Sequence, residues 1–354
     1  MPRDHRAIFT IAMRHYFGVG FLLMGILAVY VVAVPSQISF AAMQTLEFLM
    51  LGYLLIAPFR YLQLAYAGRI SGECPTRTYR AAVFLSELPA RIFSSLASGS
   101  IAPLRPDAYA TQALLSVAVI GFFAPLMISF FFIHASLLAR HLPRVILWIS
   151  GDPAAGSGER VWSNMYISAL QIIFIIDTLV FAVAYLVESG ALGNTIRSVD
   201  RSFSGWAAAM ICYPPFNAGG RLILITVGIG AAAPETVVRF PVLLASQLAA
   251  ICFFVIYVWA SIALGARAGN LVNRGIVNRG PYRYIRHPSY AAKNLSWFFQ
   301  LIPVLQQPTQ LLYFGVWAAI YVARALTEER HLGSDPDYQR YRQKVPYRFI
   351  PGVI

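Results

Sequence analysis

Charged residues are scarce in this sequence. Asp, Glu, Lys and Arg make up 12% of its 354 residues, and 58% of the residues are hydrophobic, whereas soluble domains carry about 25% charged residues. The apolar stretches lack the ten-residue alternation of an outer-membrane barrel. They run for about 18–25 residues, the length that a helix needs to cross about 30 Å of hydrocarbon. We therefore expect an all-α integral membrane protein, a polytopic bundle of about eight transmembrane helices.

Cysteine is also rare. Cys74, Cys212 and Cys252 are scattered and have no metal-ligand spacing, so neither a disulfide framework nor a cysteine metal site is expected. The sequence shows no internal repeat and no low-complexity tract. The charged N-terminus leads into a full apolar span without an obvious small-residue cleavage site, which predicts a first transmembrane helix and not a removed signal peptide.

Acidic residues are few compared with basic ones. The chain has 28 Lys and Arg against 15 Asp and Glu, a net charge of +13. No nucleic-acid-binding module is present, so we expect no nucleic-acid partner and assign the arginines to contacts with anionic lipid. The positive-inside rule then places the N-terminus, the loop with Arg60 and Arg69, the loop 137–160 and the C-terminal tail in the cytoplasm. A bacterial inner membrane is the expected location.

The apolar stretches predict the individual spans. Residues 81–103 predict a weak span, or else a re-entrant segment, that contains Glu87, Pro89 and Arg91. Residues 188–239 are irregular enough to predict a non-cytoplasmic excursion with one or two partly inserted pieces. A boundary is expected near residue 235, between an N-terminal bundle of unknown role (1–235) and a C-terminal unit (236–354). The clearer spans are Tyr16–Val34, Phe40–Pro58, Ala113–His134, Trp162–Val187, Phe240–Leu264, Leu295–Leu305 and Leu311–Leu326.

A polar stretch from Gly280 to Tyr290 interrupts the C-terminal unit and reads G-P-Y-R-Y-I-R-H-P-S-Y. The residues before its prolines are pushed out of the helical region, which predicts a rigid, non-helical arch. Donors from Arg283, Arg286 and His287 suit an anionic or carboxylate-bearing ligand. A basic loop that contacts lipid phosphates explains the same residues equally well.

Glu328 and Glu329 lie at the end of the last apolar span. Acidic residues oppose the macrodipole at a helix C-terminus, so local helix stability does not account for them. They could pair with nearby arginines or accept hydrogen bonds from a ligand.

Polar residues inside the spans are functional candidates by default. Glu47, Gln171 and Asp177 could line a cavity for a hydrophobic substrate, bind an ion in a transporter, or form hydrogen bonds between helices. A transporter would show broken helices in both halves, and none is apparent. Arg197, Asp200 and Arg201 could contact such a substrate, although we expect them on the side opposite the Gly280–Tyr290 stretch.

The order and spacing of the C-terminal segments resemble a known family. The stretch G-P-Y-R-Y-I-R-H-P-S-Y, an apolar hairpin, E-E, D-x-x-Y-x-x-Y and V-P-x-R-x-I-P together resemble the isoprenylcysteine carboxyl methyltransferase and phospholipid methyltransferase superfamily over residues 240–354. The resemblance implies a membrane helix bundle that binds S-adenosylmethionine on its cytoplasmic side. It also implies methyl transfer to a lipid, an isoprenoid or another hydrophobic acceptor, without a metal.

The resemblance also assigns site residues. Arg286, His287 and Glu329 are expected to be catalytic, and Tyr341 and Pro346 match the tail that packs over the site. The expected cofactor-binding residues are Tyr282, His287, Pro288, Tyr290, Glu328, Glu329, Tyr338 and Arg348. The chain departs from the family pattern at Ala292, where the family has glycine, and a methyl group there would narrow the approach of the cofactor.

Within this scheme Arg286 orients an anionic acceptor or the cofactor carboxylate, and a glutamate orients the cofactor's polar end. An amine acceptor needs a base, either His287 or a glutamate, whereas a carboxylate acceptor needs none. The tail V-P-Y-R-F-I-P-G-V-I also resembles the ending of membrane sterol reductases, which bind NADPH. That reductase activity, or a non-enzymatic transport or scaffold role, is the alternative. The N-terminal bundle could shape the acceptor tunnel or mediate homodimerisation.

Overall fold

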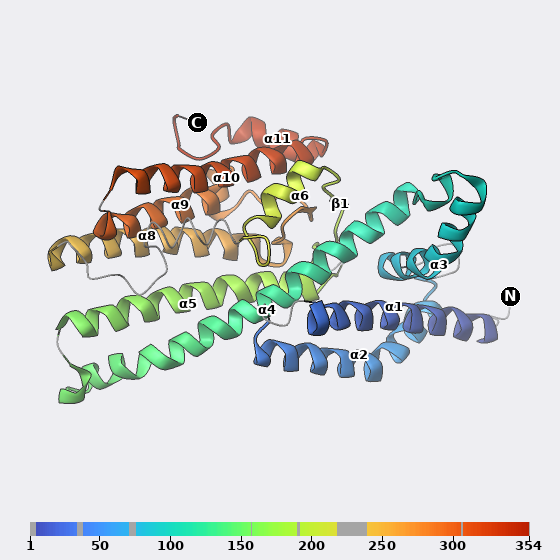
Figure 1. The fold of residues 1–354 in the computed structure, drawn as a ribbon, viewed down its shortest axis with the longest axis horizontal. Helices are drawn as coiled ribbons and strands as arrows, with labels where there is room; N and C mark the ends of the chain where they lie inside the picture. Colours follow the sequence, from blue (N-terminus) through green and yellow to red (C-terminus); the bar gives the residue numbers. More distant parts are fainter. Residues whose placement is uncertain are drawn as a thin grey trace. The chain divides into compact units, whose positions relative to one another are not determined.

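The fold is described from a computed structural model, which covers residues 5–33, 38–70, 76–156, 158–189, 192–217, 239–305 and 307–353. Within these ranges the chain is almost entirely helical (Figure 1). The helices are α1 (His5–Ala33), α2 (Phe40–Tyr66), α3 (Arg77–Ser98), α4 (Ala108–Ile149), α5 (Gly158–Leu186), α6 (Phe203–Met210), α8 (Phe240–Leu264), α9 (Pro288–Leu301), α10 (Pro308–Leu332) and α11 (Pro336–Lys344). Two short strands, β1 (Ser198–Val199) and β2 (Val272–Asn273), pair antiparallel.

Six of the described helices are long and apolar enough to cross a membrane: α1, α2, α4, α5, α8 and α10. The prediction of an all-α polytopic membrane protein is therefore confirmed. The two other segments that we counted as spans, 81–103 and 295–305, belong to α3 and α9, which are not among these six helices. Helix α3 carries an ion pair between Glu87 and Arg91 at 2.7 Å. Helix α9 has 14 residues, about 21 Å of helix, which is shorter than the hydrocarbon core.

The described chain divides into two compact units, residues 1–125 and residues 126–354. The boundary that we predicted near residue 235 falls inside the second unit. Several predicted features lie outside the described residues: Cys74, the turn at 35–37 and the apolar stretch 222–233. Cys212 and Cys252 are free.

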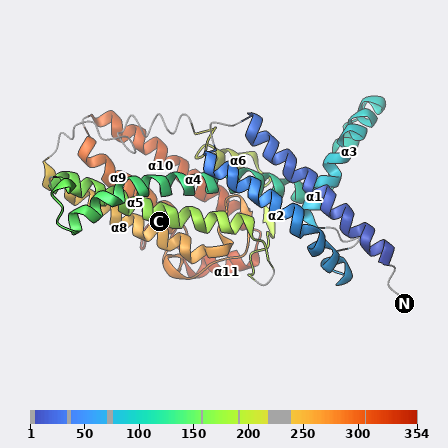
Figure 2. The same ribbon diagram turned by 90° about the horizontal axis from the view of Figure 1, so that it is seen from below.

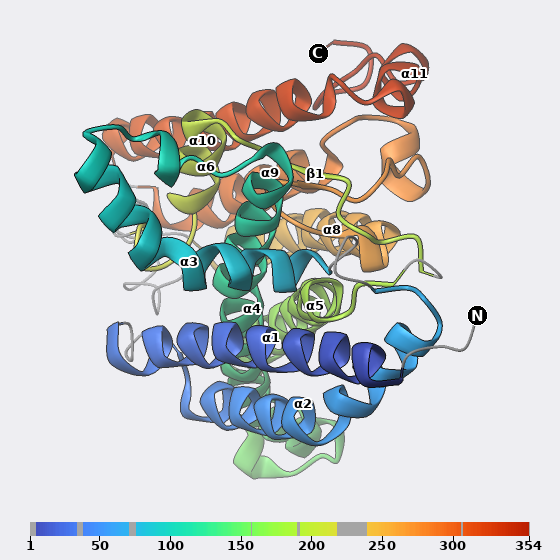
Figure 3. The same cartoon turned by 90° about the vertical axis from the view of Figure 1, so that its right-hand side faces the viewer.

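In the first unit, α1 and α2 lie side by side (Figure 3). Small and apolar side chains, Ala12, Ala65 and Ile70, are buried between them and the following turn. The Tyr53 hydroxyl donates to the Tyr16 carbonyl at 2.7 Å. Thr76 caps the N-terminus of helix α3, because its hydroxyl accepts from the Tyr79 amide at 3.3 Å, the usual arrangement at a helix N-terminus.

The core of the second unit lies among α5, α8, α9 and α10. Helices α5 and α8 run alongside each other (Figure 2), and α9 packs along α8. The buried cluster is mostly aromatic, and its rings meet edge to face, as for Phe174 and Phe254 at 5.2 Å and for Trp297 and Tyr321 at 5.3 Å. Such pairs contribute about 0.5–1.5 kcal/mol each beyond the burial of their area. The core members from the four helices are Tyr166, Leu170, Ile173, Phe254, Tyr257, Val258, Ala292, Trp297, Leu301, Trp317 and Tyr321.

The C-terminal ends of α5 and α8 meet at one end of this unit. The Tyr185 hydroxyl accepts from the Asn270 amide at 2.7 Å, and β1 pairs with β2. Arg197 contacts Asp335 and Asp337 at 3.4 and 3.0 Å. The segment 192–204 therefore lies at the same end as the Gly280–Tyr290 stretch. Our expectation that Arg197 and Asp200 lie on the opposite side is wrong, because the strand pairing joins the two loops.

Helix α4 also ends later than the sequence suggested. We expected a cytoplasmic loop over 137–160, whereas α4 continues to Ile149. His141 in this extension lies 2.9 Å from the Asn164 side chain of α5. The α4–α5 turn lies at the start of α5 and the Gly280–Tyr290 stretch at its end. The 29 residues of α5 are about 43 Å long, which is enough to cross the membrane. The α4–α5 turn and the Gly280–Tyr290 stretch therefore cannot both lie on the cytoplasmic side.

Candidate functional site

Gly280 and Pro288 determine the path of the Gly280–Tyr290 stretch. Gly280 has a φ of +58°, and a Cβ there would lie 3.0 Å from the Ala263 Cβ, so glycine is needed both for the backbone and for the close approach. Residues Gly280–Arg283 form one 3₁₀ turn. Pro288 then begins α9 at the first helical position, where its missing N–H costs nothing. The non-helical arch that we predicted over the whole stretch is thus limited to residues 284–287, between a 3₁₀ turn and the start of a helix.

Glu329 connects three separate segments. Its Oε1 atom accepts from Arg286 Nε at 2.7 Å and lies 3.1 Å from His287 Nε2. Its Oε2 atom accepts from Arg348 Nε at 3.0 Å. Glu329 and Arg286 are both buried, at 8% and 6% exposure. We call Arg286, His287, Glu329 and Arg348 the Glu329 cluster. It ties the polar stretch and the C-terminal tail to α10 in a buried, charge-assisted network.

The tail is also held by backbone hydrogen bonds. Arg286 Nη1 donates to the carbonyls of Val345 and Pro346 at 2.9 and 2.6 Å. The amides of Arg286 and His287 donate to the carbonyls of Tyr347 and Arg348, both at 2.9 Å. The tail therefore covers the polar stretch as the resemblance implied, and it does so mainly through main-chain carbonyls.

A cavity of about 570 Å³ begins at this polar end and extends among the membrane helices. We call it the central cavity. Its polar end is lined by the Gly280–Tyr290 stretch, α10 and α11, and its far end mostly by apolar side chains of α4 and α5. The volume is in the range of about 300–1,000 Å³ that is typical of small-molecule sites. The lining at the far end includes Met127, Phe130, Ile133 and Phe181.

The predicted site residues divide between the cavity wall and the layer behind it. Six of them line the central cavity: Tyr282, Arg286, His287, Tyr290, Glu328 and Tyr338. Pro288, Glu329 and Arg348 do not line it; Pro288 is buried at the start of α9, and the other two belong to the Glu329 cluster. The two glutamates thus occupy different positions, because consecutive residues of a helix point about 100° apart.

Glu328 faces the cavity and is less constrained than Glu329. Its side chain is 43% exposed, and its Oε2 atom accepts from the Tyr290 hydroxyl at 3.0 Å. The Tyr290 ring is stacked with His287 at 5.5 Å and an interplanar angle of 5°. Together these three side chains present a flat aromatic surface beside a carboxylate.

Tyr338 has a buried hydroxyl at the cavity wall. Among the described residues this hydroxyl has no hydrogen-bond partner. Burial raises the pKa of Tyr338, so that the hydroxyl stays protonated. A buried polar group without a partner costs free energy, and a ligand in the cavity would satisfy it.

The methyl group of Ala292 does not point into the central cavity. Ala292 is 3% exposed and packs in the aromatic core with Trp297 and Leu301. It is not one of the cavity residues. The departure from the family pattern therefore does not narrow the site.

Sequence reasoning missed several cavity residues. Arg324 is buried, donates to Asn270 Oδ1 at 2.6 Å and lies over the Tyr290 ring at 5.1 Å. Lys293 also lines the cavity. The sequence spacing could have indicated both residues, because Lys293 follows Tyr290 by three residues and Arg324 precedes Glu328 by four. That spacing places the members of each pair on one helix face.

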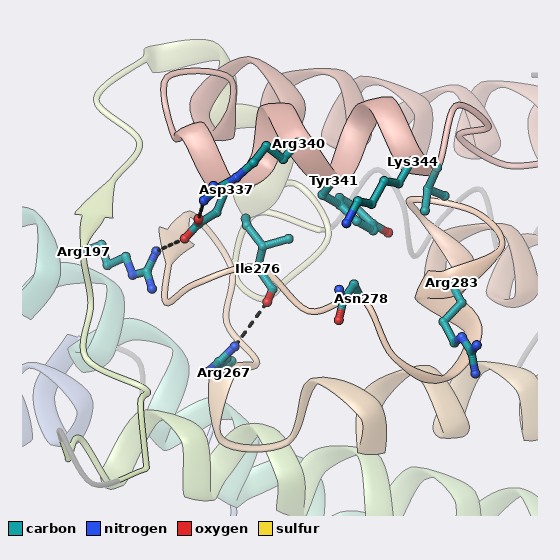
Figure 4. A pocket seen from close by; sticks show the side chains of 10 residues that line it. Arg197, Arg267, Ile276, Asn278, Arg283, Asp337, Arg340, Tyr341 and Lys344 are labelled. Carbon is teal, nitrogen blue, oxygen red and sulfur yellow. Dashed lines mark hydrogen bonds and ion pairs between the residues drawn. The ribbon is translucent and has the colours of Figure 1, made fainter.

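A second hollow of about 540 Å³ adjoins the central cavity and shares Arg267, Ile276 and Tyr341 with it (Figure 4). Its wall is strongly basic. Asp337 accepts from Arg197 and Arg340, which hold the pKa of its carboxyl below the usual range. The cations on this wall are Arg197, Arg267, Arg283, Arg340 and Lys344. Such a surface suits the polar face of a membrane rich in anionic lipid.

The isoprenylcysteine carboxyl methyltransferase (ICMT) family model matches residues 247–334. The match contains most of α8, the Gly280–Tyr290 stretch, α9, α10 and both glutamates, so the predicted family resemblance is confirmed for this C-terminal part. It indicates a membrane methyltransferase. No curated protein and no solved structure gives a significant match to the chain.

Proposed function

We propose that the chain is an S-adenosylmethionine-dependent methyltransferase that acts on a hydrophobic acceptor within the membrane. The observation that carries the proposal is the central cavity, which joins a polar end built from the family motifs to an apolar end among α4 and α5. A polar cofactor and a lipid-like acceptor can therefore meet in one space. The roles that we assign to individual residues belong to the same proposal.

The residues at the polar end fit this cofactor. S-adenosylmethionine supplies an activated methyl group on a positively charged sulfonium when it is bound. The Glu328 carboxylate and the Tyr338 hydroxyl offer an acceptor and a donor for its polar groups. The stacked His287 and Tyr290 rings offer a flat face for a planar base, and aromatic faces attract cations.

The Glu329 cluster acts as a positioning network in this proposal. It fixes Arg286 and His287 from behind, so that the cavity wall keeps its shape when ligands exchange. Positioning of the reacting groups can supply about 7–11 kcal/mol of a barrier. A displacement at a methyl carbon depends mainly on such alignment. Arg348 closes the network from the tail.

The acceptor enters from the apolar end. Met127, Phe130 and Ile133 of α4 line this part of the cavity, and their side chains suit an isoprenoid or acyl chain. Each buried methylene of such a chain contributes about 0.8 kcal/mol. The two ends of the cavity thus divide recognition between the cofactor and the acceptor tail.

The test is calorimetric titration of the purified full-length protein in detergent micelles, once with S-adenosylmethionine and once with NADPH. We expect binding of S-adenosylmethionine only. A second titration compares Tyr290→Phe, which removes the hydroxyl next to Glu328, with Tyr284→Phe. Tyr284 lies in the same stretch but is 63% exposed and serves as the matched control. We expect weaker binding for Tyr290→Phe and wild-type binding for Tyr284→Phe.

Two results would contradict the proposal. One is the absence of S-adenosylmethionine binding in a sample whose circular dichroism shows an intact helical fold. The other is binding of NADPH, which would assign the chain to the reductase class.

A further inference from the structure

A buried acidic group lies in the central cavity, away from the Glu329 cluster. Asp177 of α5 is 7% exposed. Its Oδ2 atom accepts from the Tyr257 hydroxyl at 2.6 Å, and its Oδ1 atom accepts from the Ser261 hydroxyl at 2.5 Å. None of the ion pairs in the described part of the chain involves Asp177. The carboxylate is therefore oriented by two neutral donors from α8.

A cation lies on the other side of the Tyr257 hydroxyl. Lys293 Nζ is 3.5 Å from this hydroxyl and lies over the rings of Tyr257 and Trp297, at 4.9 and 5.3 Å from their centroids. Lys293 follows Tyr290 by one helical turn, and both line the cavity. The cation therefore lines the same cavity as the residues of the proposed cofactor end.

This arrangement stabilises the fold less than a direct ion pair between the two groups would. A carboxylate and an ammonium inside a membrane protein each carry a desolvation penalty of several kcal/mol, which a direct ion pair offsets in part. Here the two charges bracket a tyrosine hydroxyl instead of forming such a pair, and both line the cavity. Ionisable groups placed in this way are candidates for functional residues.

We propose that Asp177 and Lys293 form the subsite for the methyl acceptor, and that the acceptor carries a neutral phenol-type hydroxyl on an apolar tail. The inference rests on the proposed methyltransferase function. A carboxylate head would be attracted by Lys293 but repelled by Asp177. An ammonium head would be attracted by Asp177 but repelled by Lys293 and by Arg324, which already lie over aromatic faces. A neutral hydroxyl meets neither repulsion, because it can donate to the carboxylate and accept from the ammonium.

The residues have defined roles in the transfer. The acceptor hydroxyl gives its proton to an Asp177 carboxylate oxygen, and its oxygen forms the new bond to the methyl carbon. The bond between that carbon and the sulfonium sulfur breaks, and its electron pair stays on sulfur, which leaves a neutral thioether and a methyl ether. Lys293 stabilises the negative charge that develops on the acceptor oxygen. Asp177 later releases the proton to water. A phenol has an ordinary pKa of about 10, so that a nearby cation brings its ionisation within reach.

The first experiment identifies the product. Purified wild-type protein in lipid nanodiscs is incubated with methyl-labelled S-adenosylmethionine in three separate reactions. Each reaction contains one acceptor: 4-dodecylphenol, dodecanoic acid or dodecylamine. We expect label in the phenol product that survives mild alkali, because an aryl ether resists hydrolysis and a methyl ester releases labelled methanol. Alkali-labile label with dodecanoic acid, or label in the amine alone, overturns the inference while the methyltransferase function stands. Absence of cofactor binding in the titration above would contradict the function itself.

The second experiment tests the two residues. Asp177→Asn keeps the shape and removes the base, and its control is Asp152→Asn in an exposed turn. We expect kcat with dodecylphenol to fall by about 10²–10⁴-fold, the usual contribution of a general base, without loss of cofactor binding. Unchanged kcat overturns the assignment of Asp177.

A third measurement needs no methyl donor. An alkyl nitrophenol, whose phenolate absorbs visible light, is bound to the protein and titrated with base. Lysine within about 4–6 Å of the oxygen lowers the apparent pKa of the bound phenol by about 1 to 3, and Lys293→Met should abolish that shift. Lys344→Met, at an exposed lysine of α11, is the matched control. A bound phenol whose apparent pKa is the same in Lys293→Met and wild type overturns the subsite.

Discussion

Replacement of Glu329 by glutamine should damage stability much more than the same change at its neighbour Glu328. Glu329 is buried and contacts three cationic or ionisable side chains, Arg286, His287 and Arg348. A glutamine amide leaves one oxygen to accept and places an NH₂ group against a donor. Because Arg286 is only 6% exposed, its guanidinium would remain buried without a carboxylate.

The magnitude follows from the burial of both partners. Removing one partner of a buried ion pair costs about 3–5 kcal/mol, because the other charge stays desolvated. Glu328 has a side-chain exposure of 43%, and its hydrogen bond comes from the neutral Tyr290 hydroxyl, which can still donate to a glutamine carbonyl. A typical neutral hydrogen bond contributes about 0.5–1.5 kcal/mol, so Glu328→Gln should cost less than that.

The assay has two readouts for each variant. Equilibrium unfolding in mixed micelles, followed by circular dichroism, gives the change in the free energy of unfolding. Titration with S-adenosylmethionine at a temperature where both variants are folded gives the change in affinity. We expect Glu329→Gln to lose stability and Glu328→Gln to lose affinity.

The opposite pattern would refute the reasoning. If Glu329→Gln unfolds like the wild type but no longer binds the cofactor, Glu329 is a ligand of the cofactor and the Glu329 cluster does not hold the tail. If Glu328→Gln is the less stable variant, the assignment of the cavity-facing glutamate is reversed.

Three further predictions concern the surroundings of the site. Ala292→Gly should lower the free energy of unfolding by about 1 kcal/mol through helix propensity and leave cofactor affinity unchanged, because Ala292 packs in the core; tighter binding in the titration would show that its methyl group limits the site. Removal of residues 345–354 takes away the carbonyls that accept from Arg286 and the backbone partner of His287, so cofactor binding should be lost while circular dichroism keeps the helical signal of the spans. Arg197 and Arg340 lower the pKa of Asp337, so the wild type should have a higher melting temperature than Asp337→Asn at pH values above the ordinary aspartate pKa of about 3.9. This difference in melting temperature should vanish as the pH falls through the lowered pKa. A difference that grows in acid would contradict the contact.

The sequence predicted the spans well where apolar runs and helix boundaries coincide. Helix α8 has the bounds that we expected, Phe240–Leu264, because an arginine precedes it and a glycine follows it. The sequence prediction failed at α4, where Arg140, Arg144 and Arg160 predicted a loop over 137–160, whereas the helix continues through Pro143 to Ile149. Proline is tolerated inside membrane helices when neighbouring groups satisfy the freed backbone, and a single sequence does not show those neighbours.

The site was predictable in its members and not in its geometry. The motifs predicted that Arg286, His287 and Glu329 belong to one site, and the structure places them within hydrogen-bond distance. Which glutamate faces the cavity depends on the rotation of α10, which sequence spacing alone does not fix. Asp177 was recognisable as an ionisable group in a span, whereas its partners Tyr257 and Ser261 lie 80 and 84 residues away.

Arg286 shows how the geometry limits a role that a motif suggests. Its Nε atom donates to Glu329, its Nη1 atom donates to two tail carbonyls, and its backbone amide donates to a third. A guanidinium has five N–H groups, and these contacts use the Nε group and both groups of Nη1. Only Nη2 is then left to contact a ligand from this position. The arginine that the motif marks as catalytic therefore chiefly fixes the tail over the Gly280–Tyr290 stretch, which agrees with our proposal that the acceptor is recognised by residues farther along the cavity.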